Sequence, residues 1–449
     1  MQPVLPVTTL RALIALVLAM PLAAQTVASQ AGPAPPASNE CLIGSYALAD
    51  GTDVDVGPAD EGNLRWRRKD GTTGELHTAG KLWTSTLGWT GRSDGKRVSF
   101  SACAAGRILF DGISGSKLQF DQTDTRFEGA GVQLTGRLTL PKGRSPVPIV
   151  VLVHGSERSS ALRSYALQRQ FASEGIGVFA YDKRGTGSSQ GRYTQDYLLL
   201  ANDAIAALRE ARRLAGPRAG PMGYQGGSQG GWVAPLAARI EPVDFVIVSF
   251  GLAVSPLQED REAIAFDMQR QGYGAEIQKK ADEIADASET ILLSNFTEGY
   301  DLLAEVKRKY SGEDWFKHVR GNVTHYFLAT DPEQIRREGP GLLPGIALQY
   351  DPMPVLRNLR TPQLWVLGGQ DRDAPSGETV KRLSKLKADG LDLTAAVFPM
   401  ADHGIYEYQT SEEGERMYTR NSDGYFSLMR DFILDRKVEG AYGNSRFIQ

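Results

Sequence analysis

The chain has 449 residues, of which 41% are hydrophobic and 23% are charged, a composition typical of a folded globular protein. The formal net charge is -3, and lysine and arginine are scattered along the chain. Nucleic-acid binding needs a concentrated basic surface, so this class of function is excluded.

The first 24 residues have the layout of a secretory signal peptide. A single basic residue, Arg11, precedes the apolar run Ala12–Met20, and small residues follow at positions 23 and 24. The run is short for a bilayer span, and an uncleaved anchor is the alternative. We expect cleavage, no membrane span in the mature chain, and a periplasmic or secreted protein.

Residues 41–118 follow a Pro-rich linker at residues 25–40 and contain short β-prone segments. Turn signals separate these segments, and each turn carries the Asp-Gly dipeptide that favours tight hairpins: Asp50-Gly51, Asp70-Gly71 and Asp94-Gly95. We predict a small antiparallel β domain over residues 41–118. It either packs against the rest of the protein or contributes to a substrate cleft.

The two cysteines, Cys41 and Cys103, both lie in this β domain. An even number of cysteines in an exported chain favours a disulfide, and two unpaired buried thiols are the alternative. Two cysteines without Cys-x-x-Cys or His-rich spacing do not furnish a zinc site. No metal is therefore expected.

Beyond residue 119, apolar strands alternate with helical segments. The run Ile149–Val153 is followed by a helical pattern at residues 162–174 and by a second apolar run at residues 177–182. Near-continuous apolar strands that alternate with helices indicate a mostly parallel sheet with helices on both faces, an α/β architecture.

Residues 255–350 interrupt this alternation with a polar, helical stretch that has no strand-like run. We predict that this stretch is a helical cap inserted above one edge of the sheet. It divides the α/β core into residues 119–254 and residues 351–449, where strand-like runs return at 363–368 and 393–398.

A glycine-rich turn at residues 183–191 raises the possibility of a dinucleotide site. The G-x-G-x-x-G pattern starting at Gly185 and Gly187 would require a third glycine where Gln190 stands. The turn also does not follow the first strand of its unit. No nucleotide cofactor is expected here, and nothing else in the sequence calls for a cofactor.

Ser228 has glycine two residues before it and two residues after it, at Gly226 and Gly230. This is the G-x-S-x-G pattern of a nucleophile elbow, in which a strand turns sharply into a helix and exposes the serine hydroxyl. A Cβ at either glycine would crowd the helix against the strand, and the serine must adopt a strained backbone. A glycine-rich turn without catalytic function is the alternative.

A nucleophilic serine needs a base, and the chain has five histidines. His403 follows the last predicted core strand, which places its loop at the same sheet edge as the elbow. His77 lies in the β domain, His318 and His325 lie in the cap, and His154 sits beside glycine at a strand end, where a structural role is usual. His403 is therefore the predicted base.

Asp371 is the first acidic residue after the penultimate core strand and is the predicted acid. Asp373 is a competitor, whereas Asp402 is poorly placed to reach the ring of its neighbour His403. The chain order Ser228, Asp371, His403 is the order that an elbow fold requires. Acid, base and nucleophile would form a Ser-His-Asp triad.

Acyl transfer also develops a negative oxygen, which backbone N–H groups stabilise. Gln229 follows the nucleophile at the start of its helix and offers one N–H group. The loop after the strand 149–153 offers a second at Ser156, where the preceding Gly155 permits close approach of the backbone.

Several segments together resemble the marker segments of the α/β-hydrolase superfamily, from Thr125 to the C-terminus without the cap. These are His154-Gly155, Tyr181–Ser188, Gly226–Gly231, Gly369-Gln370-Asp371 with Pro375, and Asp402-His403-Gly404. The resemblance implies an α/β-hydrolase fold with Ser228 as nucleophile, His403 as base, Asp371 as acid, and Gln229 and Ser156 as oxyanion donors. It also implies that the turn at 181–188 is structural.

The elbow is similar both to bacterial esterases and to prolyl-oligopeptidase-like peptidases. Such peptidases usually carry a large propeller, and residues 41–118 are too few for one. We therefore predict an exported serine hydrolase that cleaves a small-molecule carboxylic ester through an acyl-enzyme. A thioesterase or peptidase of the same fold, or a non-catalytic binding protein on this scaffold, are the alternatives.

Overall fold

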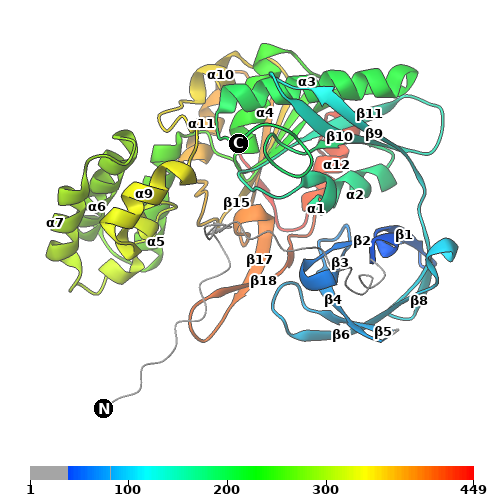
Figure 1. Ribbon diagram of the computed structural model, residues 1–449, viewed down its shortest axis with the longest axis horizontal. Helices are drawn as coiled ribbons and strands as arrows, with labels where there is room; N and C mark the ends of the chain where they lie inside the picture. The colour runs from blue at the N-terminus through cyan, green and yellow to red at the C-terminus, as the bar shows by residue number, and fades with distance from the viewer. Residues whose placement is uncertain (1–38, 81) are drawn as a thin grey trace, which may run out of the picture. The chain divides into compact units, whose positions relative to one another are not determined.

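A computed structural model of the protein describes residues 39–80 and 82–449 (Figure 1). The predicted signal peptide at residues 1–24 and residues 25–38 of the predicted linker lie outside this part of the chain. Among the helices described, none has the length and apolar character needed to cross a membrane.

The first described unit of structure is a closed antiparallel barrel of eight short strands (Figure 1). The strands are β1 Gly44–Leu48, β2 Asp53–Pro58, β3 Leu64–Arg67, β4 Thr73–Ala79, β5 Leu82–Thr86, β6 Ser93–Phe100, β7 Arg107–Phe110 and β8 Ile113–Lys117. Large apolar side chains fill the interior, among them Tyr46, Trp66 and Phe110. Because β1 pairs with β8, the sheet has no free edge strand.

Two of the three Asp-Gly dipeptides of the barrel lie in turns between strands, and the third lies inside a strand. Asp50-Gly51 connects β1 to β2 and Asp70-Gly71 connects β3 to β4, as the sequence predicted. Asp94-Gly95, in contrast, lies inside β6, so the prediction of a turn between strands is wrong there. Gly95 has φ +80°, and the register of β5 against β6 shifts at this point, which is the geometry of a β-bulge.

The disulfide joins Cys41 to Cys103 across 62 residues of sequence. It connects the segment before β1 to the short 3₁₀ turn Cys103–Ala105 that precedes β7. The bond therefore closes a loop that contains most of the barrel.

The central element of the larger unit is a nine-stranded sheet with the order β19-β16-β15-β14-β13-β11-β12-β10-β9. The strands are β9 Phe120–Glu128, β10 Gln133–Pro141, β11 Val147–Val153, β12 Gly177–Tyr181, β13 Ala219–Gly227, β14 Phe245–Ser249, β15 Gln363–Gly368, β16 Leu393–Phe398 and β19 Arg446–Phe447. The strands from β12 to β16 in this order pair in parallel. β9, β10 and β19 pair antiparallel at the two ends.

Helices cover both faces of this sheet (Figure 1). They are α1 Ala161–Ser164, α2 Leu167–Ser173, α3 Tyr197–Ala215, α4 Gly230–Ile240, α10 Met353–Asn358, α11 Gly377–Ala388 and α12 Tyr425–Asp435. Alternate residues of β11 belong to different cores: Val151 packs with α3 and α4, and Val150 packs with α2 and α12. The alternation arises because successive side chains along a strand point to opposite faces of the sheet.

Three features differ from the predicted core elements. The helix predicted over residues 162–174 is divided into α1 and α2, because Tyr165 takes an extended backbone conformation. A hairpin of β17 Tyr406–Thr410 and β18 Arg416–Asn421 follows the His403 loop, and the edge strand β19 follows α12. The sequence predicted neither the hairpin nor β19.

The cap consists of α5 Pro256–Arg270, α6 Ala275–Leu293, α7 Tyr300–Tyr310, α8 Thr324–Ala329 and α9 Pro332–Leu342. It has its own apolar core, which includes Ile264, Ile284 and Phe327, all fully buried. The structure therefore contains the helical insertion expected between β14 and β15.

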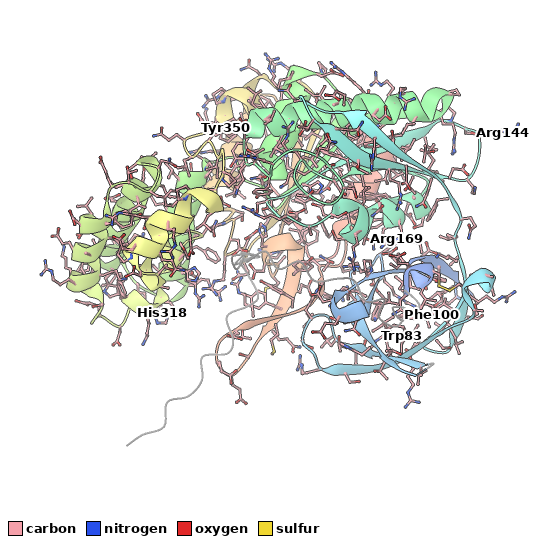
Figure 2. All side chains as sticks on the ribbon, viewed as in Figure 1. Trp83, Phe100, Arg144, Arg169, His318 and Tyr350 are labelled. Carbon is pink, nitrogen blue, oxygen red and sulfur yellow. A yellow bond between two sulfur atoms is a disulfide. The ribbon has the colours of Figure 1, made fainter. Side chains whose placement is uncertain are left out.

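A buried ion pair joins the barrel to the α/β core. Arg169 of α2 (Figure 2) donates two hydrogen bonds to the carboxylate of Asp55 on β2, at 2.7 and 2.8 Å. Lys69 of the barrel also pairs with Glu174 after α2. Bidentate geometry of this kind fixes orientation as well as distance, so α2 holds one side of the barrel.

We predict that the double substitution of Cys41 and Cys103 by serine lowers the free energy of unfolding of the barrel. In the chain-entropy model, opening a loop of this size costs about 4 kcal/mol. Urea denaturation of the oxidised and the serine-substituted protein measures this difference. A midpoint that does not change would contradict the prediction.

Candidate active site

The elbow is a tight connection between β13, which ends at Gly227, and α4, which begins at Gly230. Ser228 lies between them with φ +52°, a left-handed conformation that is rare for serine. A Cβ on Gly226 would clash with the carbonyl oxygen of Gly230, and a Cβ on Gly230 would lie 2.6 Å from the carbonyl oxygen of Val153. The predicted strain at the serine and the predicted need for both glycines are confirmed.

The structure brings Ser228, His403 and Asp371 together at one edge of the sheet. The Nε2 atom of His403 lies 3.1 Å from the Ser228 Oγ, and its Nδ1 atom lies 3.0 Å from Asp371 Oδ2. The Asp371 side chain is completely buried, whereas the His403 side chain is 23% exposed. Asp371 thus holds the ring from the protein interior, while part of the ring remains accessible to solvent.

Asp371 rather than Asp373 faces the histidine. The Oδ1 atom of Asp371 accepts hydrogen bonds from the backbone N–H groups of Ala374 and Asp373, at 2.7 and 3.1 Å. The Asp373 carbonyl accepts a hydrogen bond from Asn322 of the cap. Within the part of the chain that the structure describes, the Asp373 carboxylate makes no hydrogen bond to the ring of His403.

Asp402 has a role that the sequence did not reveal. As predicted, it does not bond to the imidazole, but its Oδ1 atom accepts the backbone N–H groups of His403, at 2.8 Å, and Arg372, at 3.1 Å. Its Oδ2 atom accepts the Tyr418 hydroxyl at 2.9 Å and pairs with Arg416. Asp402 therefore ties the loop of the base to the loop of the acid. An aspartate directly before a turn is a common cap, which is the one signal for it in the sequence.

The two expected oxyanion donors lie beside the nucleophile. A Cβ on Gly155 would lie 3.5 Å from the Cβ of Ser228, so this loop runs directly along the elbow. Gln229 is the N-cap residue of α4. The backbone N–H groups of Gln229 and Ser156 have no hydrogen-bond acceptor among the described residues.

A buried lysine holds the oxyanion loop in place. The Nζ atom of Lys183 donates to the Gly155 carbonyl at 2.7 Å, and the Tyr193 hydroxyl donates to the Ser156 carbonyl at 2.6 Å. The Gly155 carbonyl and the Ser156 N–H belong to the same planar peptide group, so Lys183 fixes the direction of that N–H. The sequence indicated only a structural turn at this lysine, because the partner is a backbone atom distant in the chain.

The electrostatics of the site favour positive charge on the imidazole. Burial lowers the pKa of His403, but Asp371, with Asp373 and Glu259, outweighs it and raises the pKa to about 10. Glu259 belongs to α5 of the cap, and burial together with Asp371 and Asp373 raises its pKa to about 8, although His403 opposes the rise. The cap thus brings a carboxyl group to the triad.

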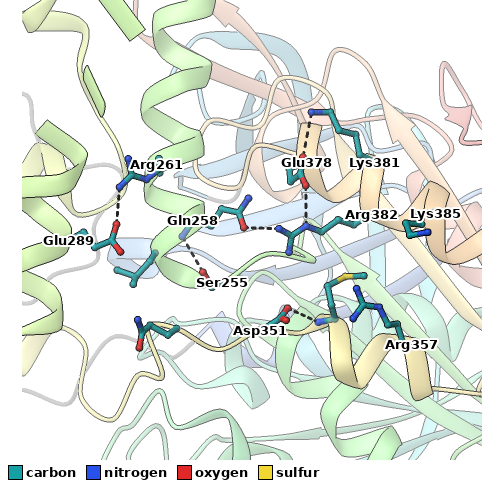
Figure 3. Close-up of a pocket in the computed structure, with 13 residues that line it drawn as sticks. Ser255, Gln258, Arg261, Glu289, Asp351, Arg357, Glu378, Lys381, Arg382 and Lys385 are labelled. Atoms are coloured by element: carbon teal, nitrogen blue, oxygen red, sulfur yellow. Dashed lines mark hydrogen bonds and ion pairs between the residues drawn. The ribbon is translucent and has the colours of Figure 1, made fainter. Parts of the chain in front are cut away.

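A separate cavity of about 800 Å³ lies where α5 begins, between α10 and α11 (Figure 3). Its lining is largely charged, and Arg382 is bound there by Glu378, Gln258 and the Ala253 carbonyl. None of the triad residues lines it.

For residues 39–80 and 82–449, no cluster of three or more His, Cys, Asp or Glu side chains could hold a metal ion.

Comparison with known proteins finds a family match for part of the chain. Residues 144–262, which include Ser156, Lys183 and Ser228, match the family model described as serine aminopeptidase, S33. The chain is 26% identical to esterase EstD of Thermotoga maritima over 263 residues, which cover 56% of this chain and 52% of that protein. It is 30% identical to esterase FrsA of Escherichia coli over 132 residues, 29% of this chain and 31% of that protein. The chain thus spans about half the length of EstD, and less of FrsA.

Two solved structures have only a distant likeness to the chain. An acylaminoacyl peptidase of Pyrococcus horikoshii superposes with a TM-score of 0.43 and 16% identity over 88% of this chain and 58% of that one. Est1E of Butyrivibrio proteoclasticus superposes with a TM-score of 0.39 and 15% identity over 69% of this chain and 96% of that one.

The family match over residues 144–262 and the similar esterases confirm the resemblance to the α/β-hydrolase superfamily that the sequence predicted.

Proposed function

We propose that the protein is a serine hydrolase that cleaves carboxylic esters through an acyl-enzyme on Ser228. The observation that carries this proposal is the unbroken hydrogen-bond chain from the Ser228 hydroxyl through His403 to the buried carboxylate of Asp371. This arrangement activates a serine, and it sits on a strained elbow that exposes the hydroxyl.

The chemistry follows from the positions of these groups. His403 Nε2 accepts the Ser228 proton as Oγ attacks the ester carbonyl carbon, and the oxyanion receives hydrogen bonds from the N–H groups of Gln229 and Ser156. Collapse of the tetrahedral intermediate breaks the bond to the alcohol oxygen, which takes the proton from His403. Water, deprotonated by His403, then attacks the acyl-enzyme and releases the acid. Asp371 keeps Nδ1 protonated and the ring oriented throughout.

Ester cleavage is preferred to peptide cleavage for two reasons. The similar proteins EstD and FrsA are both named esterases. The described domain in front of the α/β core is an eight-stranded barrel and not a propeller. Peptidase activity is the second candidate, supported by the description of the matching family model. Thioester cleavage uses the same attack on a carbonyl carbon and is the third.

Export is part of the proposal. The residues 1–24 have the composition of a signal peptide, and the bond between Cys41 and Cys103 needs an oxidising compartment such as the periplasm or the exterior. A small-molecule ester is the proposed partner.

Replacing Ser228 by alanine should lower kcat for p-nitrophenyl acetate by about 10⁴-fold or more, because the nucleophile and its base act as one unit. A thermal melt and circular dichroism, expected to match the wild type, control for folding. A fluorophosphonate probe should label the wild type and not the variant. Retained turnover in the variant would exclude Ser228 as the nucleophile. A wild type that neither hydrolyses the ester nor reacts with the probe would favour a binding protein.

Esterase, thioesterase and peptidase activities separate on a matched panel. We expect kcat/KM for short acyl p-nitrophenyl esters to exceed that for the corresponding thioesters and aminoacyl p-nitroanilides. For the amides, the physical reason is that a phenoxide leaves more readily than an amine. For the thioesters, the expectation rests on the similar proteins, which are named esterases. Faster cleavage of aminoacyl amides would instead favour the peptidase.

The pH dependence of kcat/KM should have its acid limb above the ordinary imidazole value of about 6.5. The nearby carboxylates raise the pKa of His403, and only the neutral ring can act as base, so the rate rises as pH increases through this value. Glu259→Gln removes one of these carboxyl groups and should move the limb to lower pH. A limb at or below 6.5 in the wild type would contradict this electrostatic account.

Lys183→Met should lower kcat by about 10-fold with little change in KM, because the oxyanion N–H of Ser156 loses its support. Arg158 is a matched control: it stacks on the same Tyr193 ring as Lys183 does, but its guanidinium donates to the Gly341 carbonyl. Arg158→Met should keep kcat within about twofold. Equal losses in both variants would show that Tyr193 packing, and not the lysine, is what matters.

A further inference from the structure

The hairpin of β17 and β18 begins directly after the loop that carries His403 and lies beside the barrel (Figure 1). Two backbone hydrogen bonds and one side-chain hydrogen bond join it to loops of the barrel. Trp89 N–H donates to the Tyr418 carbonyl at 2.8 Å, and Asn421 N–H donates to the Gly71 carbonyl at 3.0 Å. The guanidinium of Arg420 donates to the Asp70 carbonyl. The hairpin is thus bound by two loops of the barrel.

These two loops fit the hairpin closely. Gly71 and Gly88 have φ values of +90° and +53°, and a Cβ on either would clash with hairpin backbone, at Asn421 and Thr419 respectively. Glycine at these two positions permits both the left-handed conformation and the close approach. The barrel surface is therefore shaped for the hairpin and not merely adjacent to it.

The same hairpin residues bind the His403 loop with their side chains. The Nδ2 atom of Asn421 donates to the Gly404 carbonyl at 3.0 Å, and the Tyr418 hydroxyl donates to Asp402 at 2.9 Å. Tyr418 and Asn421 thus contact the barrel through their backbone and the catalytic loop through their side chains. No further element stands between the barrel and the loop along this route.

An aromatic contact runs parallel to these hydrogen bonds. Trp89 of the barrel packs edge-on against Tyr406, with ring centroids 4.8 Å apart, and the guanidinium of Arg65 lies over the Trp89 ring, 4.4 Å from its centroid. The ring of Tyr406 in turn fills the space beside Gly404, where a Cβ would clash with it. Trp89 therefore contacts Tyr406, and Tyr406 in turn packs against Gly404 of the His403 loop.

The His403 loop needs such support because its backbone is strained. Gly404 has φ +75° and the next residue, Ile405, has φ +58°, which is a rare conformation for a β-branched residue. A strained loop persists only where its surroundings hold it in place. The hairpin also reaches the other loop of the triad, because Arg416 donates to the Gln370 carbonyl at 2.6 Å and pairs with Asp402.

We propose that the barrel is a positioning domain, which holds the β17–β18 hairpin so that His403 is presented to Ser228 at hydrogen-bond distance. The proposal rests on the hydrolase function proposed above. It assigns Trp89, Tyr418 and Asn421 as positioning residues. A barrel that only packs against the core would instead act on stability, without a preferential effect on the triad.

The test compares Trp89→Ala and Asn421→Ala with Lys69→Ala in the full-length protein, using p-nitrophenyl acetate. Trp89 is 36% exposed, so its removal should leave the barrel folded. We expect kcat to fall about 10-fold in the first two variants with KM within about twofold, because small displacements of a catalytic group are costly. Lys69→Ala removes the side-chain contact to Glu174 but leaves the Asp70 and Gly71 carbonyls that bind the hairpin, so it should keep kcat within about twofold.

A spectroscopic readout follows the histidine itself. In protein with ¹⁵N-labelled histidine, the proton on Nδ1 of His403 should give a downfield signal in the wild type and in Lys69→Ala. In Trp89→Ala and Asn421→Ala the signal should broaden or disappear, because the ring is no longer held against Asp371. Thermal melts verify that all variants remain folded.

Two outcomes would overturn the inference: unchanged kcat and Nδ1 signal in Trp89→Ala and Asn421→Ala, or an equal loss in Lys69→Ala. A wild type that neither hydrolyses esters nor reacts with a fluorophosphonate would defeat the proposed function instead. In that case the Nδ1 signal still tests whether the barrel positions the ring.

Discussion

The proposed activity depends on one imidazole ring, which must hydrogen-bond to two different side chains at the same time. His403 reaches Ser228 with Nε2 and Asp371 with Nδ1, at 3.1 and 3.0 Å, and the three residues come from distant parts of the chain. A parallel sheet solves this problem because the carboxyl ends of its strands meet at one edge. β13, β15 and β16 each end at a loop that carries one member of the set.

Each of the three side chains has its own support. Close backbone packing fixes the conformation of Ser228, because a Cβ on Gly226 or Gly230 would clash with neighbouring backbone atoms. Backbone N–H groups hold Asp371, and complete burial keeps water away from it. His403 is the most dependent of the three, because its loop includes the strained Ile405 and relies on a network outside the sheet. The proposed role of the barrel is to hold the hairpin in this network, and thereby to position His403.

The sequence predicted the α/β core and the three converging residues because these features leave local signals. The elbow needs glycines at fixed spacing, and apolar strands reveal the sheet edge. It did not reveal the β17–β18 hairpin. The first three residues of β17 and all of β18 are half-buried, so burial does not alternate along these strands. Lys183 binds the backbone carbonyl of Gly155, and Asp402 binds the backbone N–H of Arg372. Distant backbone partners of this kind carry no residue-type signature. Asp94-Gly95 is a bulge because the register of neighbouring strands, not the dipeptide, decides its role.

The most direct test of the central claim is mass analysis of the protein quenched with acid during turnover of a slowly deacylated p-nitrophenyl ester. The account predicts an increase equal to the mass of the acyl group, located by peptide mapping on the segment that contains Ser228. Absence of an adduct during active turnover, or an adduct on a different residue, would contradict the account.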